Sequence, residues 1–286
     1  MLASVPMGRI DGCAEYRAAE YPPRRTSPSL RKTAVGESMG KPAGMSDVEW
    51  GMRCDLAATF RLSVRFGFNE GLGNHFSLMM PDHDDRFLVN ARGLLFQEIT
   101  ASNLLVVDFK GNVISGNREV RSVTYHIHAP VHAANPAAKC AIHLHPPNIT
   151  ALAMVEGGRM GMAHHNNLLV NHRVAYDDAA TGPATNLEEG YRLAQALGNA
   201  TTLVMANHGV MTVGPTVHDA FHELCVVEKT VGYQLQAAST GLPLRRQPDH
   251  LRWTHHTGAW SDVHDGRQFL DAWRRILDRE EPDYAS

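Results

Sequence analysis

The chain is poor in the features that mark secreted, membrane and nucleic-acid-binding proteins. It holds 4 cysteines in 286 residues, without a C-x-x-C pattern, which fits free thiols in a reducing cytoplasm better than a disulfide framework. No apolar run reaches the length of a signal peptide or a membrane span. The formal net charge is -3 with both signs interspersed, which leaves no electrostatic footprint for nucleic acid. We therefore expect a soluble, cytoplasmic protein that binds neither nucleic acid nor membrane.

The sequence motifs of nucleotide cofactors are missing as well. We find no P-loop and no G-x-G-x-x-G segment, so a nucleotide cofactor has no support. There is no internal repeat. With 43% hydrophobic residues, a chain of this length can bury a sizeable core in one large domain or two small ones.

Composition and periodicity divide the chain into three parts. Residues 1–45 are rich in Pro, Arg, Ser and Gly without sustained periodicity, which predicts a mobile tail or an arm lying on a partner subunit. Residues 46–240 carry the regular patterns of a folded domain. Residues 241–286 form a C-terminal extension with one short helix, and Tyr284 is expected to lie in its frayed end.

Within the main domain, strand-like and helix-like patterns alternate irregularly. A capping box at Ser46–Glu49 starts a helix that runs to Phe66, and Gly67 is a plausible stop. Strands are expected at 76–79, 86–90, 104–108, 112–114 and 202–206 and around residue 143, and helices at 123–133, 148–155, 217–238 and from 186 onward. Because no regular βαβ repeat emerges, a mixed sheet covered by helices fits better than a doubly wound parallel one.

Two histidines stand out as a candidate metal half-site. His143 and His145 follow an apolar, β-branched lead-in, and strand alternation would point both imidazoles the same way. A third candidate, His208, follows another apolar strand, and Gly209 would let the backbone turn sharply beside it. Three neutral imidazoles leave coordination positions open, as a catalytic metal requires. The alternative is that these are hydrogen-bonded core histidines, since the chain holds 17 histidines in all.

Four segments in this order resemble the class II aldolase and adducin family. They are Glu70–Ser77, Asn90–Gly93 with Glu98–Thr100, His143–His145 and Asn207–Gly209, and the resemblance covers about residues 46–240. It implies a three-layer α/β/α sandwich with a mixed, mainly antiparallel central sheet. It also implies a divalent ion held by the three histidines, with zinc first and manganese or iron as alternatives, and a homo-oligomer, often a tetramer with sites at subunit interfaces.

One departure from the family pattern concerns the acid/base residue. Sugar-phosphate aldolases of this family carry a glutamate in a Ser-Ser-Glu run before the helix that precedes the histidine pair, and the matching stretch here is Ser122–Thr124. Glu119 lies nearby, but a loop glutamate is expected to be solvated. If the following segment is helical, His128 shares a face with Thr124 and is our first candidate for general acid or base. His126 is the second.

A second departure concerns the anion cradle. Alignment on the family turns puts His75 where the aldolases have asparagine and Arg92 near the second phosphate-binding turn, while Arg121 flanks Ser122. Arginine pairs with carboxylate in bidentate fashion, so the substrate anion is expected to be a carboxylate. Arginines that are solvated or paired within the protein are the alternative. The candidate substrate-binding residues are His75, Arg92, Ser122, Thr124, His164 and His165.

These features favour a metal-dependent lyase. The expected reaction is decarboxylation or retro-aldol cleavage of a carboxylate-bearing oxo, hydroxy or phenolic compound through a metal-stabilised enolate. The alternatives are a non-haem iron oxygenase on the same three histidines, a sugar-phosphate aldolase, and a non-catalytic interaction protein of the adducin type. The last would be expected to have broken metal ligands, whereas all three histidines are intact.

Overall fold

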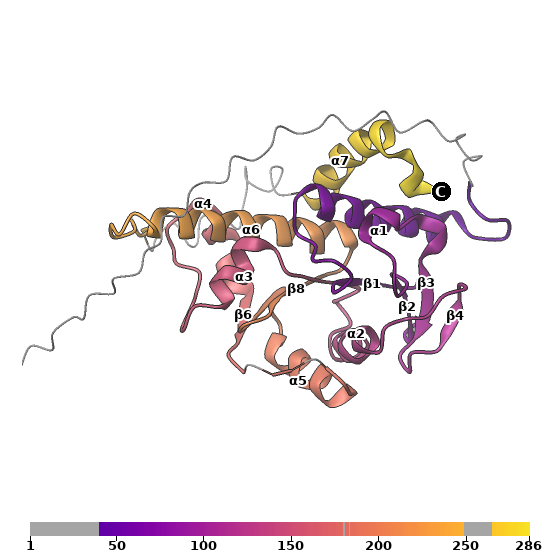
Figure 1. The fold of residues 1–286 in the computed structure, drawn as a ribbon, viewed down its shortest axis with the longest axis horizontal. Helices are drawn as coiled ribbons and strands as arrows, with labels where there is room; N and C mark the ends of the chain where they lie inside the picture. The colour runs from indigo at the N-terminus through magenta and orange to yellow at the C-terminus, as the bar shows by residue number, and fades with distance from the viewer. Residues whose placement is uncertain (1–39, 180, 183, 249–264) are drawn as a thin grey trace, which may run out of the picture. The chain divides into compact units, whose positions relative to one another are not determined.

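An eight-stranded sheet runs through the centre of the computed structural model, which describes residues 40–179, 181–182, 184–248 and 265–286 (Figure 1). The strand order is β4-β3-β2-β1-β5-β8-β7-β6, with β6 and β7 parallel and the other neighbours antiparallel. The strands are β1 (His75–Met79), β2 (Arg86–Val89), β3 (Leu105–Asp108), β4 (Val113–Ser115), β5 (Cys140–Leu144), β6 (Val174–Asp177), β7 (Thr202–Met205) and β8 (Gly209–Gly214).

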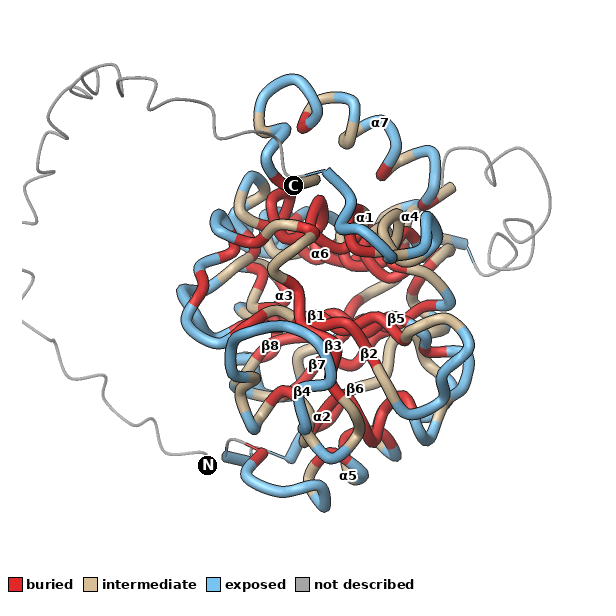
Figure 2. Tube along the Cα trace, turned by 90° about the vertical axis from the view of Figure 1, so that its right-hand side faces the viewer, coloured by how far each residue is buried: buried red, intermediate tan, exposed pale blue. Residues whose placement is uncertain are grey.

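Helices cover both faces of this sheet. They are α1 (Asp47–Arg65), α2 (Ser122–Ala134), α3 (Pro147–Ala153), α4 (His165–Val170), α5 (Leu187–Leu197), α6 (Val217–Ala238) and α7 (Gly266–Glu280). Figure 2 shows α1, α3, α4, α6 and α7 on one side of the buried strands and α2 with α5 on the other. The expected three-layer sandwich with a mixed, mainly antiparallel sheet is confirmed.

The helix starts follow from their capping residues. Ser46 Oγ accepts from the Glu49 amide at 3.1 Å and begins α1, and Asn186 begins α5 in the same way. Such side chains satisfy one of the amides that a helix start leaves unpaired. Glu49 does not close the expected capping box, because its carboxylate instead accepts from Nε of Arg53 at 2.8 Å.

The alternation along β5 decides where the site lies. Cys140, Ile142 and Leu144 belong to the apolar cluster that includes the buried side chains of α1 and α6, whereas Ala141 belongs to the cluster formed with α2 and α5. Since successive strand residues point to opposite faces, His143 points to the α2 side.

The C-terminal end is packed, and the expectation of a frayed Tyr284 is wrong. Its ring is fully buried; its hydroxyl donates to Asp278 at 2.7 Å and accepts from Nε of Arg274 at 3.1 Å. Arg61 on α1 pairs with Asp283 at 2.7 Å. The Arg61 ion pair holds this end against α1, and α7 also packs on α6.

Other sequence expectations have simpler outcomes. Cys54, Cys140 and Cys225 are free thiols, as expected, while Cys13 lies outside the described residues. Most of the predicted N-terminal tail also lies outside them. Among the helices described, none is long and apolar enough to cross a membrane.

Candidate metal centre

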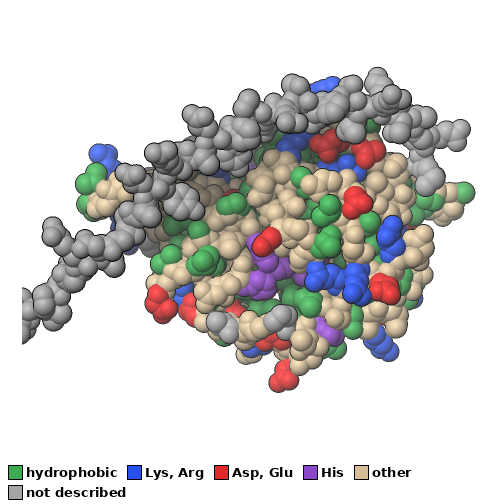
Figure 3. All heavy atoms as spheres, in the orientation of Figure 1, with side chains coloured by type: hydrophobic (Ala, Val, Ile, Leu, Met, Phe, Trp, Pro, Cys, Tyr) green, Lys and Arg blue, Asp and Glu red, His purple; other side chains and the backbone are tan. Residues whose placement is uncertain are grey.

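Three histidines meet at one end of the sheet. His143 is in β5, His145 follows that strand, and His208 lies in the hairpin between β7 and β8. Because β8 pairs with both β5 and β7, these segments lie side by side. The possible ligand atoms of the three rings all lie within 4.8 Å of one another. On the face seen in Figure 3, histidine side chains gather near the centre, with basic side chains beside them.

The hydrogen bonds of the three rings fit a metal site. Nδ1 of His143 donates to the Val210 carbonyl at 3.0 Å, which leaves its Nε2 bare. Nδ1 of His145 contacts the Glu70 carboxylate at 2.6 Å, and its Nε2 is buried without a hydrogen-bond partner. An ion about 2.1 Å from each nitrogen needs ligand separations of at most about 4.2 Å, so small ring movements suffice.

Glu70 is a site residue whose role the sequence reasoning missed. Its carboxylate fixes the tautomer of His145, an arrangement typical of metal-bound imidazoles. Its own amide donates to Oδ1 of Asn74 at 2.6 Å, which holds the loop before β1. The signal in the sequence was an acidic residue at the start of the family-like segment Glu70–Ser77.

Asn207 and Gly209 shape the hairpin that carries His208. The left-handed residue is Asn207, with φ of 55°, whereas Gly209, where a sharp turn was expected, begins β8. Asparagine tolerates this conformation better than most residues. Gly209 is needed for space, since a Cβ there would lie 2.5 Å from Cδ2 of His145 and 2.6 Å from the Leu144 carbonyl oxygen.

Two further histidines, His75 and His128, lie next to the cluster. His75 begins β1 directly opposite His143, with their ring centroids 4.9 Å apart, and its Nδ1 lies 2.7 Å from Nε2 of His128. Burial lowers the pKa of both His75 and His128 well below the ordinary value. His128 is fully buried with Ser77 on its other nitrogen, so any catalytic role it has must act through His75.

The predicted basic residues have different surroundings. Nη1 of Arg92 donates to Glu119 at 3.1 Å, and both side chains are exposed, so Glu119 is paired and not simply solvated as expected. Arg121 donates to the Leu72 carbonyl and lies near enough to His75 to contribute to its lowered pKa. The structure therefore brings Arg121 to the cluster, while the partner it shows for Arg92 is Glu119.

The other candidates lie on the helices α2 and α4. Ser122 and Thr124 form the first turn of α2, the former exposed and the latter buried. Nδ1 of His126 lies 3.3 Å from the Ala184 carbonyl.

His164 and His165 start α4, which packs on α6. The His164 ring lies 4.9 Å from that of Tyr233 on α6. His164 and His165 therefore lie on the face of the sheet opposite α2, whereas His143 points to the α2 face.

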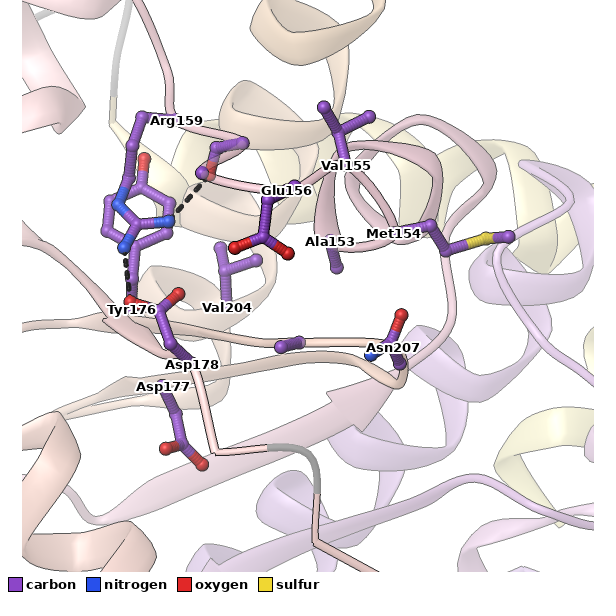
Figure 4. A pocket seen from close by; sticks show the side chains of 13 residues that line it. Ala153, Met154, Val155, Glu156, Arg159, Tyr176, Asp177, Asp178, Val204 and Asn207 are labelled. Atoms are coloured by element: carbon purple, nitrogen blue, oxygen red, sulfur yellow. Dashed lines mark hydrogen bonds and ion pairs between the residues drawn. The ribbon is translucent and has the colours of Figure 1, made fainter.

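A cavity of about 200 Å³ adjoins the hairpin (Figure 4). Asn207 lies at one end, and Glu156, Asp178, Arg159 and Tyr176 line the remainder, with Glu156 pointing inward. Arg159 pairs with Asp178 at 2.6 Å and lies over the Tyr176 ring, so its charge is already engaged. Glu156 and Asp178 make this side of the hairpin acidic.

Comparisons with known proteins agree with the fold and identify the family. The family model described as Class II Aldolase and Adducin N-terminal domain matches residues 54–235. A Caulobacter vibrioides protein named "Putative aldolase class 2 protein" is 34% identical over 247 residues, which is 84% of this chain and 94% of that protein. The crystal structure of an aldolase II superfamily protein from Pseudomonas syringae has 30% identity and a TM-score of 0.77, covering 85% of this chain and 98% of its own. An L-fuculose 1-phosphate aldolase from Glaciozyma antarctica shares the fold, with 22% identity and a TM-score of 0.71 over 84% of this chain and 96% of its own. The chain belongs to the class II aldolase and adducin N-terminal domain family.

Proposed function

We propose that this protein is a divalent-metal-dependent lyase that cleaves a C–C bond in a small carboxylate-bearing oxo, hydroxy or phenolic compound, by decarboxylation or retro-aldol reaction. The observation that carries the proposal is the cluster of His143, His145 and His208, with the bare, buried Nε2 of His145. A divalent ion held there would act as a Lewis acid and stabilise negative charge that develops on an oxygen next to the breaking bond.

The substrate carboxylate is assigned to the Arg121 side of the cluster. An arginine is always charged near neutral pH and can bind a carboxylate through two parallel hydrogen bonds. Arg121 donates to the carbonyl of Leu72, in the loop that leads to His75, which supports this assignment. Ser122 and Thr124 on the next turn supply hydroxyl groups for the same substrate, and Arg92 would join them if it left Glu119.

Proton handling is assigned to the His75–His128 pair. The family's glutamate position is taken by Ser122–Thr124, which has no carboxylate, and the nearby Glu70 is held by His145. His128 lies one hydrogen bond behind His75, so the two rings would act together. His126, with its contact to Ala184, is the second candidate.

The same proposal includes the identity of the ion, the oligomeric state and the cellular compartment. Zinc is our first choice of ion, with manganese and iron as alternatives; three imidazoles suit all three ions and do not select among them. We also propose a cytoplasmic homotetramer. The presence of all three histidines, His143, His145 and His208, argues against a purely structural role of the adducin type.

A substrate screen tests the proposal. The full chain is loaded with Zn²⁺, Mn²⁺ or Fe²⁺ and incubated with 2-oxo acids, 2-hydroxy acids, phenolic acids and sugar phosphates, in air and under argon, while products are followed by NMR. We expect cleavage of a carboxylate substrate without oxygen uptake, abolished by EDTA and by His143→Ala but kept by His83→Ala on an exposed loop. Turnover of sugar phosphates alone, oxygen-dependent turnover, or no turnover by metal-loaded protein would overturn it.

A further inference from the structure

A chain of buried hydrogen bonds runs from the loop before β5 to the metal centre. His132 Nδ1 lies 2.6 Å from the Ala138 carbonyl oxygen, and its Nε2 lies 2.7 Å from Ser77 Oγ. Ser77 Oγ also contacts His128 Nδ1, and His128 Nε2 lies 2.7 Å from His75 Nδ1. All four side chains are at most 5% exposed. His128 and His132 are four residues apart on α2, and His75 and Ser77 are two residues apart on β1, so each pair shares one face.

The carbonyl at the far end fixes the direction of every hydrogen bond in this chain. A carbonyl only accepts, so His132 donates from Nδ1 and, as a neutral ring, accepts at Nε2 from the Ser77 hydroxyl. Ser77 Oγ then accepts from Nδ1–H of His128. His128 in turn accepts at Nε2 from Nδ1–H of His75. Each tautomer is thereby determined by its neighbour, and the last ring is left with a bare Nε2.

We propose that His132, Ser77 and His128 are positioning residues that hold His75 as the Nδ1–H tautomer and present its bare Nε2 to the metal centre as a hydrogen-bond acceptor. The Nδ1 end of the His75 ring is taken by His128, and the ring lies 4.9 Å from that of His143. With one proton on each ring, every hydrogen bond of this series has one donor and one acceptor.

The bare Nε2 of His75 limits the class of substrates that fit the site. This inference rests on the proposed function. A bare ring nitrogen accepts a proton from a hydroxyl group and repels the lone pairs of carboxylate, phosphate or carbonyl oxygens. Arg121, which donates to the carbonyl of Leu72 three residues before His75, supplies the positive charge for an anion. An acceptor beside a cation fits a hydroxy acid, whose hydroxyl donates to His75 while its carboxylate meets the guanidinium. The His75 position therefore selects hydroxy acids over oxo acids and phosphates.

The tautomer is tested first, on metal-free full-length protein. Selective ¹⁵N-histidine labelling and long-range ¹H–¹⁵N NMR distinguish the protonated ring nitrogen from the bare one, and His75→Gln assigns the signals. We expect Nδ1–H and a bare Nε2 at His75. An Nε2–H tautomer or a doubly protonated ring would overturn the inference whether or not the protein binds metal.

Variants test whether the hydrogen-bond chain sets the tautomer of His75. Ser77→Ala leaves Nδ1–H of His128 without an acceptor, so that ring should switch to Nε2–H and force His75 to Nε2–H as well. Ser77→Thr restores the hydroxyl and should restore the tautomer. Ser63→Ala, which removes an equally buried hydroxyl that donates to Thr59, is the matched control and should change neither ring. An unchanged His75 tautomer in folded Ser77→Ala would overturn the positioning role.

Binding tests the selectivity. Glycolate and acetate differ by one hydroxyl, and their affinities for zinc-loaded protein are measured by calorimetry with inorganic phosphate as a third probe. We expect the preference for glycolate over acetate to fall about tenfold in His75→Leu relative to wild type. An equal preference in both proteins, with zinc bound in both, would overturn the hydroxyl assignment and leave the metal-dependent lyase standing. Absence of zinc binding would remove the lyase proposal and leave the tautomer result intact.

Discussion

Gly209 and His145 lie so close together that the site has room for only a hydrogen on Cα at position 209. A Cβ there would lie 2.5 Å from Cδ2 of the imidazole. Gly209 begins β8 and is not among the residues with positive φ, so its backbone would accept other residues. The glycine of the Asn-His-Gly segment thus makes room for the imidazole of His145, which directly follows the neighbouring strand β5.

Gly209→Ala is expected to abolish metal binding by displacing the His145 ring. The added methyl would also lie 2.6 Å from the Leu144 carbonyl, so we expect a loss of about 1–3 kcal/mol in unfolding free energy from overpacking. Metal content and urea denaturation measure the two effects. Gly51→Ala, in α1 with open space around its Cβ, is the control and should keep its metal. Full metal occupancy in Gly209→Ala would contradict this reading.

Glu70→Gln is expected to weaken metal binding about 10- to 100-fold. The amide oxygen can still accept from Nδ1 of His145, but it lacks the charge that makes the imidazole a better ligand. Competition with a chromogenic chelator gives the affinity. Glu119→Gln removes a similarly exposed carboxylate that pairs with Arg92, and it should leave the affinity unchanged. Equal affinities in the two variants would show that Glu70 does not orient the ligand.

Acidification is expected to destabilise the metal-free protein. Burial lowers the pKa of His132 to about 4, below its unfolded value of about 6.5. The unfolded state therefore binds more protons below pH 6.5, and stability that is complete above that pH is lost as the pH falls toward 4. Each such ring costs up to about 1.4 kcal/mol per pH unit.

Urea denaturation between pH 7.5 and 5 measures this slope. His132→Gln should reduce it by up to about one proton, whereas Ser63→Ala should leave it unchanged. A pH-independent unfolding free energy in the wild-type protein would contradict the buried, neutral state of these rings.

The C-terminal end should contribute strongly to stability through Tyr284. Tyr284→Ala is expected to cost about 3–5 kcal/mol, because it empties a fully buried site against α7. Tyr284→Phe should cost about 1 kcal/mol through its lost hydrogen bonds with Arg274 and Asp278. Tyr191→Ala, at a position 55% exposed, is the control and should have little effect in urea denaturation. Similar values for the two alanine variants would contradict the packing of this end.

Local patterns predicted most of the elements that carry the site. The helix expected at 217–238 has those bounds in the structure, and Ser46 begins α1 as expected. Both depend on signals within a few residues, namely a capping side chain and a repeating apolar face. Local patterns do not predict strand β8, because it starts at Gly209 and glycine is typical of turns.

The contacts within the site could not be predicted in the same way. Glu70 reaches His145 across 75 residues, and Ser77 reaches His132 across 55. Spacing along the chain does not reveal such pairs, because strand pairing and helix packing bring them together. The sequence indicates which histidines share a face of α2. The structure adds that His128 is fully buried and that its Nε2 contacts His75.

The metal content of the purified full chain tests the central claim most directly. After incubation with Zn²⁺ and removal of free ions, mass spectrometry should find one ion per chain in the wild type and in His83→Ala. The variants His143→Ala, His145→Ala and His208→Ala should each hold less than about a tenth of that amount. A wild-type chain without metal, or triad variants with full occupancy, would contradict a metal centre at these three histidines.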